Sequence, residues 1–313
     1  MAKETSSPRK SKAMTEVFAK LRSIGEAFNP DTIAENFKLF TPLHDQGAVA
    51  AIDVERDLRY GPDERNRLDV FLPEDEDSAP KPVLIFMHGG GFIGGDKSLP
   101  AAPFWNNVGI WAARHGLLGV NITHRLAPQH QWPAGSEDVA AAVKWTRENI
   151  AKYGGDPNRI FLMGQSAGGA HVAQYLAHER FASADRQALA GAILVSGLYD
   201  TNTMDKNPMF KAYFGEDAKL YAERSAVPGV ADTTVPLLVV LAEHDPADFK
   251  RQYVELLKAF VDKKRALPHL LWLPGHGHLS TMLSIGTSDE TFGDRILDFI
   301  ETAGATRSAA SAT

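Results

Sequence analysis

The sequence predicts an α/β fold built on a mostly parallel sheet, with helices on both faces and a small helical lid. Short, continuous apolar runs such as 82–87, 117–123 and 160–163 alternate with segments that have helical spacing. Strands that are apolar at every position are buried on both faces, which is typical of parallel sheets covered by helices. The chain has 313 residues, of which 44% are hydrophobic and 23% charged, and this suffices for one such domain with a lid.

Composition and charge exclude several classes of protein. The net charge is -6 and no basic stripe is interleaved with aromatic residues, so we expect no nucleic-acid partner. The chain has no cysteine, which excludes disulfides, thiolate nucleophiles and cysteine-ligated metals. The first residues lack the apolar stretch of a signal peptide, and runs such as 235–242 are too short to span a membrane. We therefore expect a cytoplasmic protein without a membrane partner; a homodimer is expected only because two-fold oligomers are common.

The two ends of the chain differ in pattern from its centre. Residues 1–13 and 304–313 are small and polar, and we expect disordered tails there. Residues 14–48 are expected to form N-terminal helices that make part of the lid, with Asp31 as the N-cap of the second helix after Pro30. These two helices are expected at 14–28 and 31–40.

Residues 49–303 carry the alternating strand and helix signals of the main domain. The turn Gly61-Pro62-Asp63 predicts an edge hairpin between 51–59 and 67–72. A segment rich in aromatic residues and methionine, at about 200–232, interrupts the alternation and predicts an insertion that contributes to the lid. Further strands are expected at 82–87, 117–123, 160–163, 188–196, 235–242 and 269–273, and further helices at 102–115, 134–153, 167–178, 247–261 and 281–302.

A nucleophile elbow is predicted at residues 164–168, whose sequence is Gly-Gln-Ser-Ala-Gly. The string follows a buried strand and precedes a helix rich in alanine and glycine, which is the context that this motif requires. A serine hydroxyl reacts only when it is exposed, oriented and paired with a base, and a sharp strand–turn–helix connection provides the first two conditions. Glycine at 164 and 168 relieves crowding around the strained turn. Ser166 is therefore the predicted nucleophile of a serine hydrolase.

A glycine-rich turn at residues 88–92, His-Gly-Gly-Gly-Phe, directly follows the predicted strand 82–87. Consecutive glycines let the backbone approach a ligand closely, and preorganised N–H groups stabilise the oxyanion that forms during acyl transfer. We assign these donors to Gly90 and Gly91, and a third to Ala167, the residue after the nucleophile.

The acid and the base are expected later in the chain, in the order serine, acid, histidine that accompanies a nucleophile elbow. Asp245 follows the strand 235–242 at the edge where catalytic groups of parallel sheets gather, and it is the predicted acid. Asp200, at the end of the preceding strand, is the alternative; otherwise it caps the lid segment. Glu243 lies nearer to the strand and is less suitable.

The base is expected in the segment Gly275-His276-Gly277-His278, after the last strand. His278 is preferred because it precedes the C-terminal helix, from where its side chain can point back over the sheet. His276 then supports the site or faces solvent. A His-x-His pair is also found in metal sites, but the acidic ligands that such a site needs are missing nearby. His171, on the elbow helix, is expected to pack rather than to react.

These residues predict two-step acyl transfer without a metal or an organic cofactor. The expected substrate is a small-molecule carboxylic ester with a short- to medium-chain or aromatic acyl group, and an arylformamidase or amidase with the same triad is the alternative. A binding protein that had lost catalysis on this fold would lack a triad member, and none is missing here. Aromatic residues could line an apolar pocket or equally well pack the lid shut; the candidates are Phe92, Trp105, Phe210, Tyr213 and Phe214.

Several motifs of this chain occur together in one known family. They are the turn at 88–92, Gly-Gln-Ser-Ala-Gly-Gly at 164–169, and His-Arg-Leu-Ala-Pro at 124–128 followed by Trp-Pro-Ala at 132–134. Together they resemble the hormone-sensitive-lipase-like branch of the α/β-hydrolases, which includes many bacterial carboxylesterases. The family usually has tyrosine in place of His124, phenylalanine in place of Trp132 and leucine in place of Ala247. The resemblance covers about residues 55–300 and implies an eight-stranded sheet with a lid built from the N-terminus and the insertion.

Three other stretches are similar to the kynurenine-formamidase-like and feruloyl-esterase-like enzymes. They are Tyr60-Gly61 with Leu-Asp-Val-Phe at 68–71, Ser-Gly-Leu-Tyr-Asp at 196–200 and Gly-His-Leu-Ser at 277–280. In that group the histidine of the last motif is catalytic, so the resemblance independently supports His278 as the base.

Overall fold

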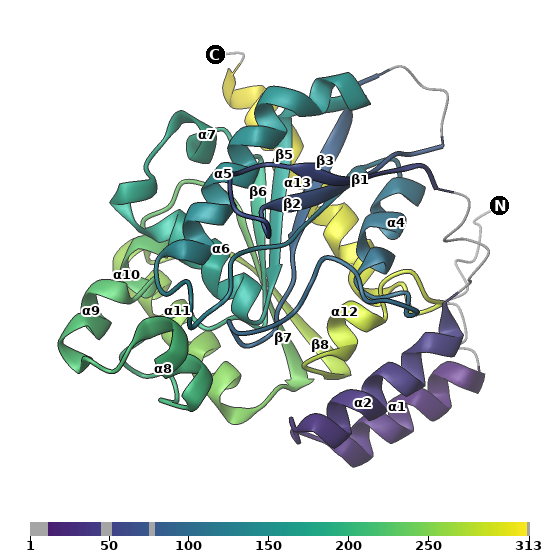
Figure 1. Ribbon diagram of the computed structural model, residues 1–313, viewed down its shortest axis with the longest axis vertical. Helices are drawn as coiled ribbons and strands as arrows, with labels where there is room; N and C mark the ends of the chain where they lie inside the picture. The colour runs from purple at the N-terminus through teal and green to yellow at the C-terminus, as the bar shows by residue number, and fades with distance from the viewer. Residues whose placement is uncertain (1–11, 45–51, 75–78, 312–313) are drawn as a thin grey trace.

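The computed structural model describes residues 12–44, 52–74 and 79–311, which form a central sheet between two layers of helices (Figure 1). The expected tail at 1–13 and the stretch 45–48 of the N-terminal region therefore lie almost wholly outside the described residues. The eight strands are β1 (Val54–Arg59), β2 (Arg67–Phe71), β3 (Lys81–Met87), β4 (Leu118–Ile122), β5 (Gly155–Gln165), β6 (Gly191–Val195), β7 (Leu237–His244) and β8 (His269–Gly277).

The strand order is β1-β2-β4-β3-β5-β6-β7-β8. All neighbours from β4 to β8 are parallel, whereas β2 is antiparallel to both β1 and β4. This confirms the predicted α/β class with a mostly parallel sheet. The predicted hairpin at 51–59 and 67–72 forms, but of its two strands only β1 lies at the edge of the sheet, because β2 also pairs with β4.

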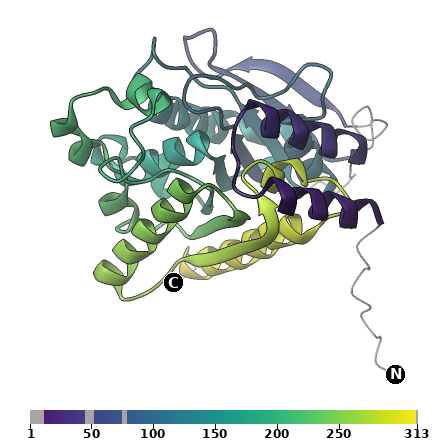
Figure 2. The same ribbon diagram turned by 90° about the horizontal axis from the view of Figure 1, so that it is seen from below.

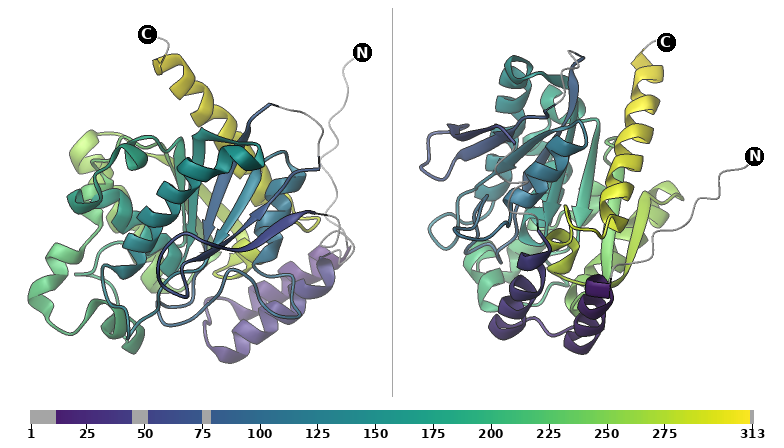
Figure 3. Two further views of the ribbon diagram at one scale, coloured as in Figure 1. Left: turned by 45° about the horizontal axis from the view of Figure 1, so that its top comes forward. Right: turned by 90° about the vertical axis from the view of Figure 1, so that its right-hand side faces the viewer.

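Helices cover both faces of the sheet, as the side view in Figure 3 shows. Alternate residues of one strand face opposite layers: Ile85 of β3 packs in one apolar cluster and Phe86 in the other. Every residue from Val83 to Met87 is consequently buried, which explains the continuous apolar run in the sequence. One face carries α5 (Ala134–Asn149), α6 (Ala167–Ala177), α10 (Val227–Val230) and α11 (Ala247–Lys264), and the other carries α4 (Asn106–Arg114) and α13 (Thr291–Ser311).

The N-terminal helices α1 (Lys12–Ile24) and α2 (Pro30–Phe40) lie side by side, next to the end of β8 (Figures 1 and 2). A short 3-10 turn, η1 (Thr41–Leu43), follows them. The prediction of Asp31 as the N-cap was wrong. Asn29 is the cap, and its side chain accepts hydrogen bonds from Asp31 N and Thr32 N, both at 3.1 Å. Pro30 takes the first helical position, where its missing N–H costs nothing, so the cap must precede it.

The predicted insertion at 200–232 is mostly helical. In Figure 1 it lies at the lower left of the sheet, whereas α1 and α2 lie at the lower right. Its elements are α8 (Pro208–Phe214), η4 (Ala218–Leu220), α9 (Tyr221–Arg224) and α10. Before it, η3 (Glu179–Phe181) and α7 (Ala184–Gln187) connect α6 to β6.

The helix predicted at 281–302 is two helices. The short α12 (Ser280–Leu283) ends before Gly286, whose φ of 85° breaks the helical path, and α13 begins five residues later. α13 continues through Ser311, into the range where we expected a disordered tail. The helix predicted at 134–153 ends at Asn149 and continues as a 3-10 turn, η2 (Ile150–Tyr153). Among the described residues, no helix combines the length and the apolar character needed to cross a lipid bilayer.

Candidate active site

The connection between β5 and α6 is a sharp turn centred on Ser166. Its backbone has φ 58° and ψ -122°, a conformation that residues other than glycine rarely adopt. The turn is held from both sides, because Ser166 N donates to Val195 O and Ala170 N donates to Ser166 O, both at 3.0 Å. The serine is thereby fixed at the carboxyl end of the sheet, directly before the first turn of α6.

Two glycines allow the elbow and the turn after β3 to lie against each other. A Cβ on Gly168 would collide with the carbonyl oxygen of Met87 and lie 2.6 Å from that of His88. A Cβ on Gly89 would lie 2.9 Å from the Cβ of Ser166. Glycine is therefore needed here for the approach of two separate segments, and not only for the crowding inside the elbow.

We expect Gly168→Ala to lower the free energy of unfolding by about 1–3 kcal/mol, because the added methyl group must push apart two backbone segments. The same displacement moves the turn at 88–92 relative to Ser166, so kcat should fall by about tenfold or more. Urea denaturation and the hydrolysis of methyl butyrate in a pH-stat measure the two effects. Gly94→Ala is the matched control, since the nearest atom to its Cβ would be 3.8 Å away. Equal effects of the two substitutions would contradict this account.

Three polar side chains from different strands meet at the elbow. Ser166 Oγ lies 2.9 Å from His278 Nε2, and His278 Nδ1 lies 2.7 Å from Asp245 Oδ1. Ser166 follows β5, Asp245 follows β7 and His278 follows β8, and all three are buried. The structure thus brings together the three residues that the sequence selects. Because Asp245 accepts the Nδ1–H of His278, the lone pair on Nε2 faces the serine hydroxyl.

The second carboxylate oxygen of Asp245 is also occupied. Oδ2 accepts hydrogen bonds from Ser196 Oγ at 2.6 Å and from Ala242 N at 2.7 Å. These bonds fix the plane of the carboxylate beside His278. The alternative acid, Asp200, does not contact His278: Oδ1 accepts from Asn202 N at 3.0 Å, so it caps the start of the insertion instead.

The loop that carries His278 is fastened to its surroundings by hydrogen bonds. Gln165 Nε2 donates to His278 O at 3.1 Å, which ties the loop to the residue before the nucleophile. Gly275 N donates to Glu243 Oε2 at 2.6 Å, so the less suitable acid candidate anchors this loop. The position of the imidazole is therefore set by main-chain contacts as well as by Asp245.

The neighbouring His276 has a different environment. Its Nε2 lies 3.1 Å from Asp289 Oδ2 and its Nδ1 lies 3.2 Å from Ser280 Oγ. The imidazole ring and the carboxylate are both buried. Burial by itself raises the pKa of Asp289, but hydrogen bonds from His276 and Thr291 outweigh it and bring the pKa down to about 2. His276 contacts neither Ser166 nor Asp245 and supports the loop.

The turn after β3 offers unpaired backbone donors. Gly90 and Gly91 have φ values of 129° and 61°, which glycine adopts without strain. Gly90 O closes the turn by accepting from Gly94 N at 3.1 Å. Within the described residues, the N–H groups of Gly90, Gly91 and Ala167 have no hydrogen-bond acceptor. They are thus available to an oxygen of a ligand held beside Ser166.

Three imidazole rings are buried in contact behind this turn. His88 stacks on His124 with ring centroids 4.4 Å apart, and His124 meets His171 edge to face at 5.0 Å. His88 Nδ1 donates to Gly89 O at 2.6 Å, whereas the other five ring nitrogens have no partner in the described residues. Burial lowers the pKa of His88 to about 4 and that of His171 to about 3, and it lowers the pKa of His124 well below its ordinary value. The three rings are therefore neutral at neutral pH.

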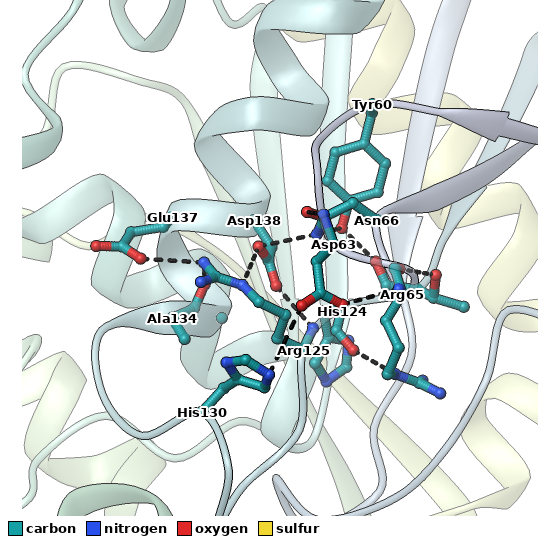
Figure 4. Close-up of polar contacts among 12 residues, drawn as sticks. Tyr60, Asp63, Arg65, Asn66, His124, Arg125, His130, Ala134, Glu137 and Asp138 are labelled. Atoms are coloured by element: carbon teal, nitrogen blue, oxygen red, sulfur yellow. Dashed lines mark hydrogen bonds and ion pairs between the residues drawn. The ribbon is translucent and has the colours of Figure 1, made fainter.

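A polar network joins the β1–β2 hairpin to the loops around this turn (Figure 4). Arg65 Nε donates to His124 O at 2.7 Å, and Arg65 Nη2 donates to Gly95 O at 2.8 Å. Asp138 on α5 accepts from Arg125 N at 2.7 Å and from Arg125 Nε at 2.8 Å. Because bidentate and buried contacts restrict motion, the network holds the glycine-rich loop and the segment after β4 in one arrangement.

The aromatic residues that we considered for the pocket pack on one another. Phe92 stacks on Tyr213 at 4.9 Å, Phe210 contacts Phe214 at 5.0 Å, and all four are buried in one apolar cluster between the insertion and the elbow helix. Trp105 lies in a different cluster, under α2. None of these rings contacts His278. The insertion contacts the glycine-rich turn through the stacked pair Phe92 and Tyr213, and also through Met209, whose Sδ lies where a Cβ of Gly91 would project.

The sequence did not single out four residues that touch the site. Ser196 and Gln165 adjoin predicted strand ends, and that position is the signal that could have found them. Phe28 and Phe249 both contact the His278 ring, at centroid distances of 4.8 Å and 4.1 Å. Their proximity arises only from the packing of α1, α2 and α11, and no motif marks it.

Comparisons with known proteins concern the family and the fold of the chain. The model of a family described by its alpha/beta hydrolase fold matches residues 84–269. The chain is 29% identical to Esterase LipC of Mycobacterium tuberculosis, over 71% of this chain and 59% of that protein. It is 39% identical to the isoprenylcysteine alpha-carbonyl methylesterase ICME of Arabidopsis thaliana, over 38% of this chain and 26% of that protein. The matches therefore span about three fifths of these relatives or less.

Solved structures show the same fold. Esterase B from Lactobacillus Rhamnosis superposes with a TM-score of 0.71 at 20% identity, covering 96% of this chain and 99% of its own. An esterase of Pyrobaculum calidifontis gives a TM-score of 0.64 at 20% identity and covers equal shares. The elbow after β5, the glycine-rich turn after β3 and the family match over more than half of the chain lead to one conclusion: this chain belongs to the alpha/beta hydrolase fold family.

Proposed function

We propose that this chain is a serine hydrolase of the carboxylesterase type. The observation that carries the proposal is the hydrogen-bonded row Asp245–His278–Ser166, with distances of 2.7 and 2.9 Å, beside three backbone N–H groups that have no acceptor. A nucleophile, a base, an orienting acid and oxyanion donors are the parts that acyl transfer requires. The relatives whose names denote esterases support the same reading.

In the first half of the reaction, His278 Nε2 accepts the proton of Ser166 as Oγ attacks the carbonyl carbon of the ester. The negative charge that develops on the carbonyl oxygen is stabilised by the N–H groups of Gly90, Gly91 and Ala167. Asp245 keeps His278 in the tautomer that accepts at Nε2 and stabilises the imidazolium. His278 then donates its proton to the leaving alkoxy oxygen, the C–O bond breaks, and the acyl group remains on Ser166.

In the second half, water resolves the acyl-enzyme. His278, neutral again, removes a proton from the attacking water, and the same N–H groups stabilise the second oxyanion. The proton passes from His278 back to Ser166 Oγ as the carboxylic acid leaves. Loss of any of the three side chains would interrupt both halves. The proposed substrates are esters with short- to medium-chain or aromatic acyl groups.

Labelling with a fluorophosphonate probe tests the nucleophile directly, because such probes phosphonylate serines that a base activates. We expect peptide mass spectrometry to find the label on Ser166, and Ser166→Ala to abolish it. A label on another serine would refute the assignment. Rates of acid release from methyl butyrate and N-formylkynurenine then show whether the enzyme prefers an ester or a formamide bond. Faster cleavage of N-formylkynurenine would favour the arylformamidase alternative over the esterase.

A further inference from the structure

The ring of His278 is enclosed by two phenylalanine side chains from distant parts of the chain. Phe249, on α11, lies against it with ring centroids 4.1 Å apart, and Phe28, on the turn between α1 and α2, meets it edge to face at 4.8 Å. Only 4% of His278 is exposed, whereas 41% of Phe28 is. Phe28 belongs to none of the apolar core clusters, so core packing does not account for its position.

The turn that carries Phe28 is tied across the site to α11. Glu26 Oε1 lies 2.5 Å from Lys250 Nζ, and Lys250 is the residue after Phe249. Phe18 of α1 packs edge to face on His276 at 5.1 Å, which seats the N-terminal helices on the histidine loop. These contacts hold the two phenylalanine rings on the same imidazole.

Little space is left between this turn and the histidine loop. The hollow there has a volume of about 20 Å³, and its walls include Phe28 and Ala27 on one side and His244, Pro246 and His278 on the other. A hollow needs about 10–15 Å³ to hold one water molecule. With the Phe28 ring in place, the hollow has room for one or two carbon atoms and not for a long or cyclic group.

The proposed reaction determines what must occupy this space. His278 Nε2 passes its proton to the leaving oxygen, so the alcohol departs alongside the imidazole ring. Substituents of the alcohol therefore have to fit past the side chains that touch the ring. Phe249 is fixed on a helix of 18 residues, while Phe28 projects from a turn. Removing the Phe28 ring is thus the change that enlarges the leaving-group side.

We propose that Phe28 selects the leaving alcohol by size and restricts the enzyme to esters of small alcohols such as methanol and ethanol. The inference rests on the proposed esterase function. It adds a limit on the size of the leaving alcohol, which the catalytic residues do not define. The acyl group lies on the other side of the ester carbonyl from the leaving alcohol, so in this proposal its selection does not depend on Phe28.

Two ester series measured in a pH-stat test the proposal. In the first, acetates of methanol, ethanol, butanol and benzyl alcohol vary the leaving group; in the second, methyl esters of acetic, butyric and hexanoic acids vary the acyl group. For the wild type, we expect kcat/KM to be about tenfold lower for benzyl than for ethyl acetate, since a misfit of this size costs tenfold or more in a tight pocket. Phe28→Ala should raise kcat/KM for butyl and benzyl acetate about tenfold. It should leave the acyl series within about twofold of the wild type.

Two further variants make the result specific. Phe28→Trp should lower kcat/KM for ethyl acetate relative to methyl acetate, and it tests the proposal even if Phe28→Ala does not fold. Phe37→Leu is the matched control, because Phe37 lies in the same helical pair but packs on Phe104 at 5.3 Å. It should not change the order of the alcohols.

Two outcomes would overturn the proposal while the enzyme remains an esterase. One is a wild-type rate that does not depend on the size of the alcohol. The other is an equal loss on all esters in Phe28→Ala, which would make the ring a mere support of His278. A wild type that hydrolyses no ester and is not labelled by the fluorophosphonate would instead refute the proposed function, and this inference with it.

Discussion

Replacing Ser166 with alanine should lower kcat for methyl butyrate by about 10^6-fold, the scale of loss that follows removal of a serine nucleophile. The substitution deletes only Oγ, which His278 Nε2 contacts at 2.9 Å, so His278 loses the group from which it takes the proton. The elbow retains its shape, because alanine and serine place the same Cβ on a backbone with φ 58°. A pH-stat assay at saturating ester gives kcat, and thermal unfolding followed by circular dichroism checks the fold.

A second buried serine provides the matched control. Ser284 Oγ donates to Thr281 O at 3.3 Å, just after the histidine loop, and contacts none of the reacting atoms. Ser284→Ala also removes one buried hydroxyl hydrogen bond, as Ser166→Ala does, but it should keep kcat within about threefold of the wild type. If Ser166→Ala retained a tenth of the wild-type kcat, another residue would have to be the nucleophile.

Acid should unfold this protein at a higher pH than its carboxylates alone would require, because of the three buried imidazoles. An unfolded histidine has a pKa of about 6.5, whereas burial lowers the pKa of His88 to about 4 and of His171 to about 3 in the folded chain. Between these values the unfolded chain binds protons that the folded chain excludes. The stability is therefore complete above about pH 6.5 and falls as the pH drops toward 4.

The expected loss is large. Each excluded proton costs up to about 1.4 kcal/mol per pH unit, so His88, His124 and His171 together cost about 4 kcal/mol per unit. Two units below pH 6.5 this approaches the whole stability of a typical domain, about 5–15 kcal/mol. Urea denaturation at about pH 7.5, 6 and 5 measures the slope. A free energy of unfolding that stayed constant over this range would contradict the prediction.

His124→Phe isolates the contribution of the imidazoles. The substitution keeps a ring between His88 and His171 but removes one titrating group and two nitrogens without a partner. The slope should fall by about one third, and the stability at neutral pH should rise, since an unpaired buried polar group costs about 1–3 kcal/mol. His269→Gln, at an exposed histidine outside this cluster, is the matched control. Asp289, whose pKa is lowered to about 2, adds to acid unfolding only below about pH 4.

The placement of the three proposed catalytic residues could be predicted because it follows from the sheet. Ser166, Asp245 and His278 each come directly after an apolar run, and the carboxyl ends of parallel strands share one edge. The glycine-rich turn has the same explanation, since it follows β3, the neighbour of β5. Local pattern and topology therefore suffice to bring these segments together without knowledge of the side-chain packing.

The features that the sequence did not reveal depend on contacts between segments that are far apart in the chain. No motif links such segments. His124 and His171 lie on different elements, and each alone reads as an ordinary packed histidine. Phe28 is the last residue of the helix expected at 14–28, but α1 ends at Ile24, so Phe28 lies on the turn that follows. The break at Gly286 did have a local signal, the polar run Thr-Ser-Asp-Glu-Thr at 287–291, which the prediction of one helix over 281–302 passed over.

The position of β8 has a consequence for how the activity is lost. β5, which carries the serine, has hydrogen-bonded neighbours on both sides, whereas β8, which carries the histidine, has one neighbour in the sheet, β7. Marginal elements open locally more often than central ones, and amide hydrogen exchange reports such opening. The proposed base is thus held by a less protected part of the molecule than the proposed nucleophile. The N-terminal helix α1 packs on β8 and, through Phe18, on His276 of the histidine loop, so it supports that edge of the sheet from outside.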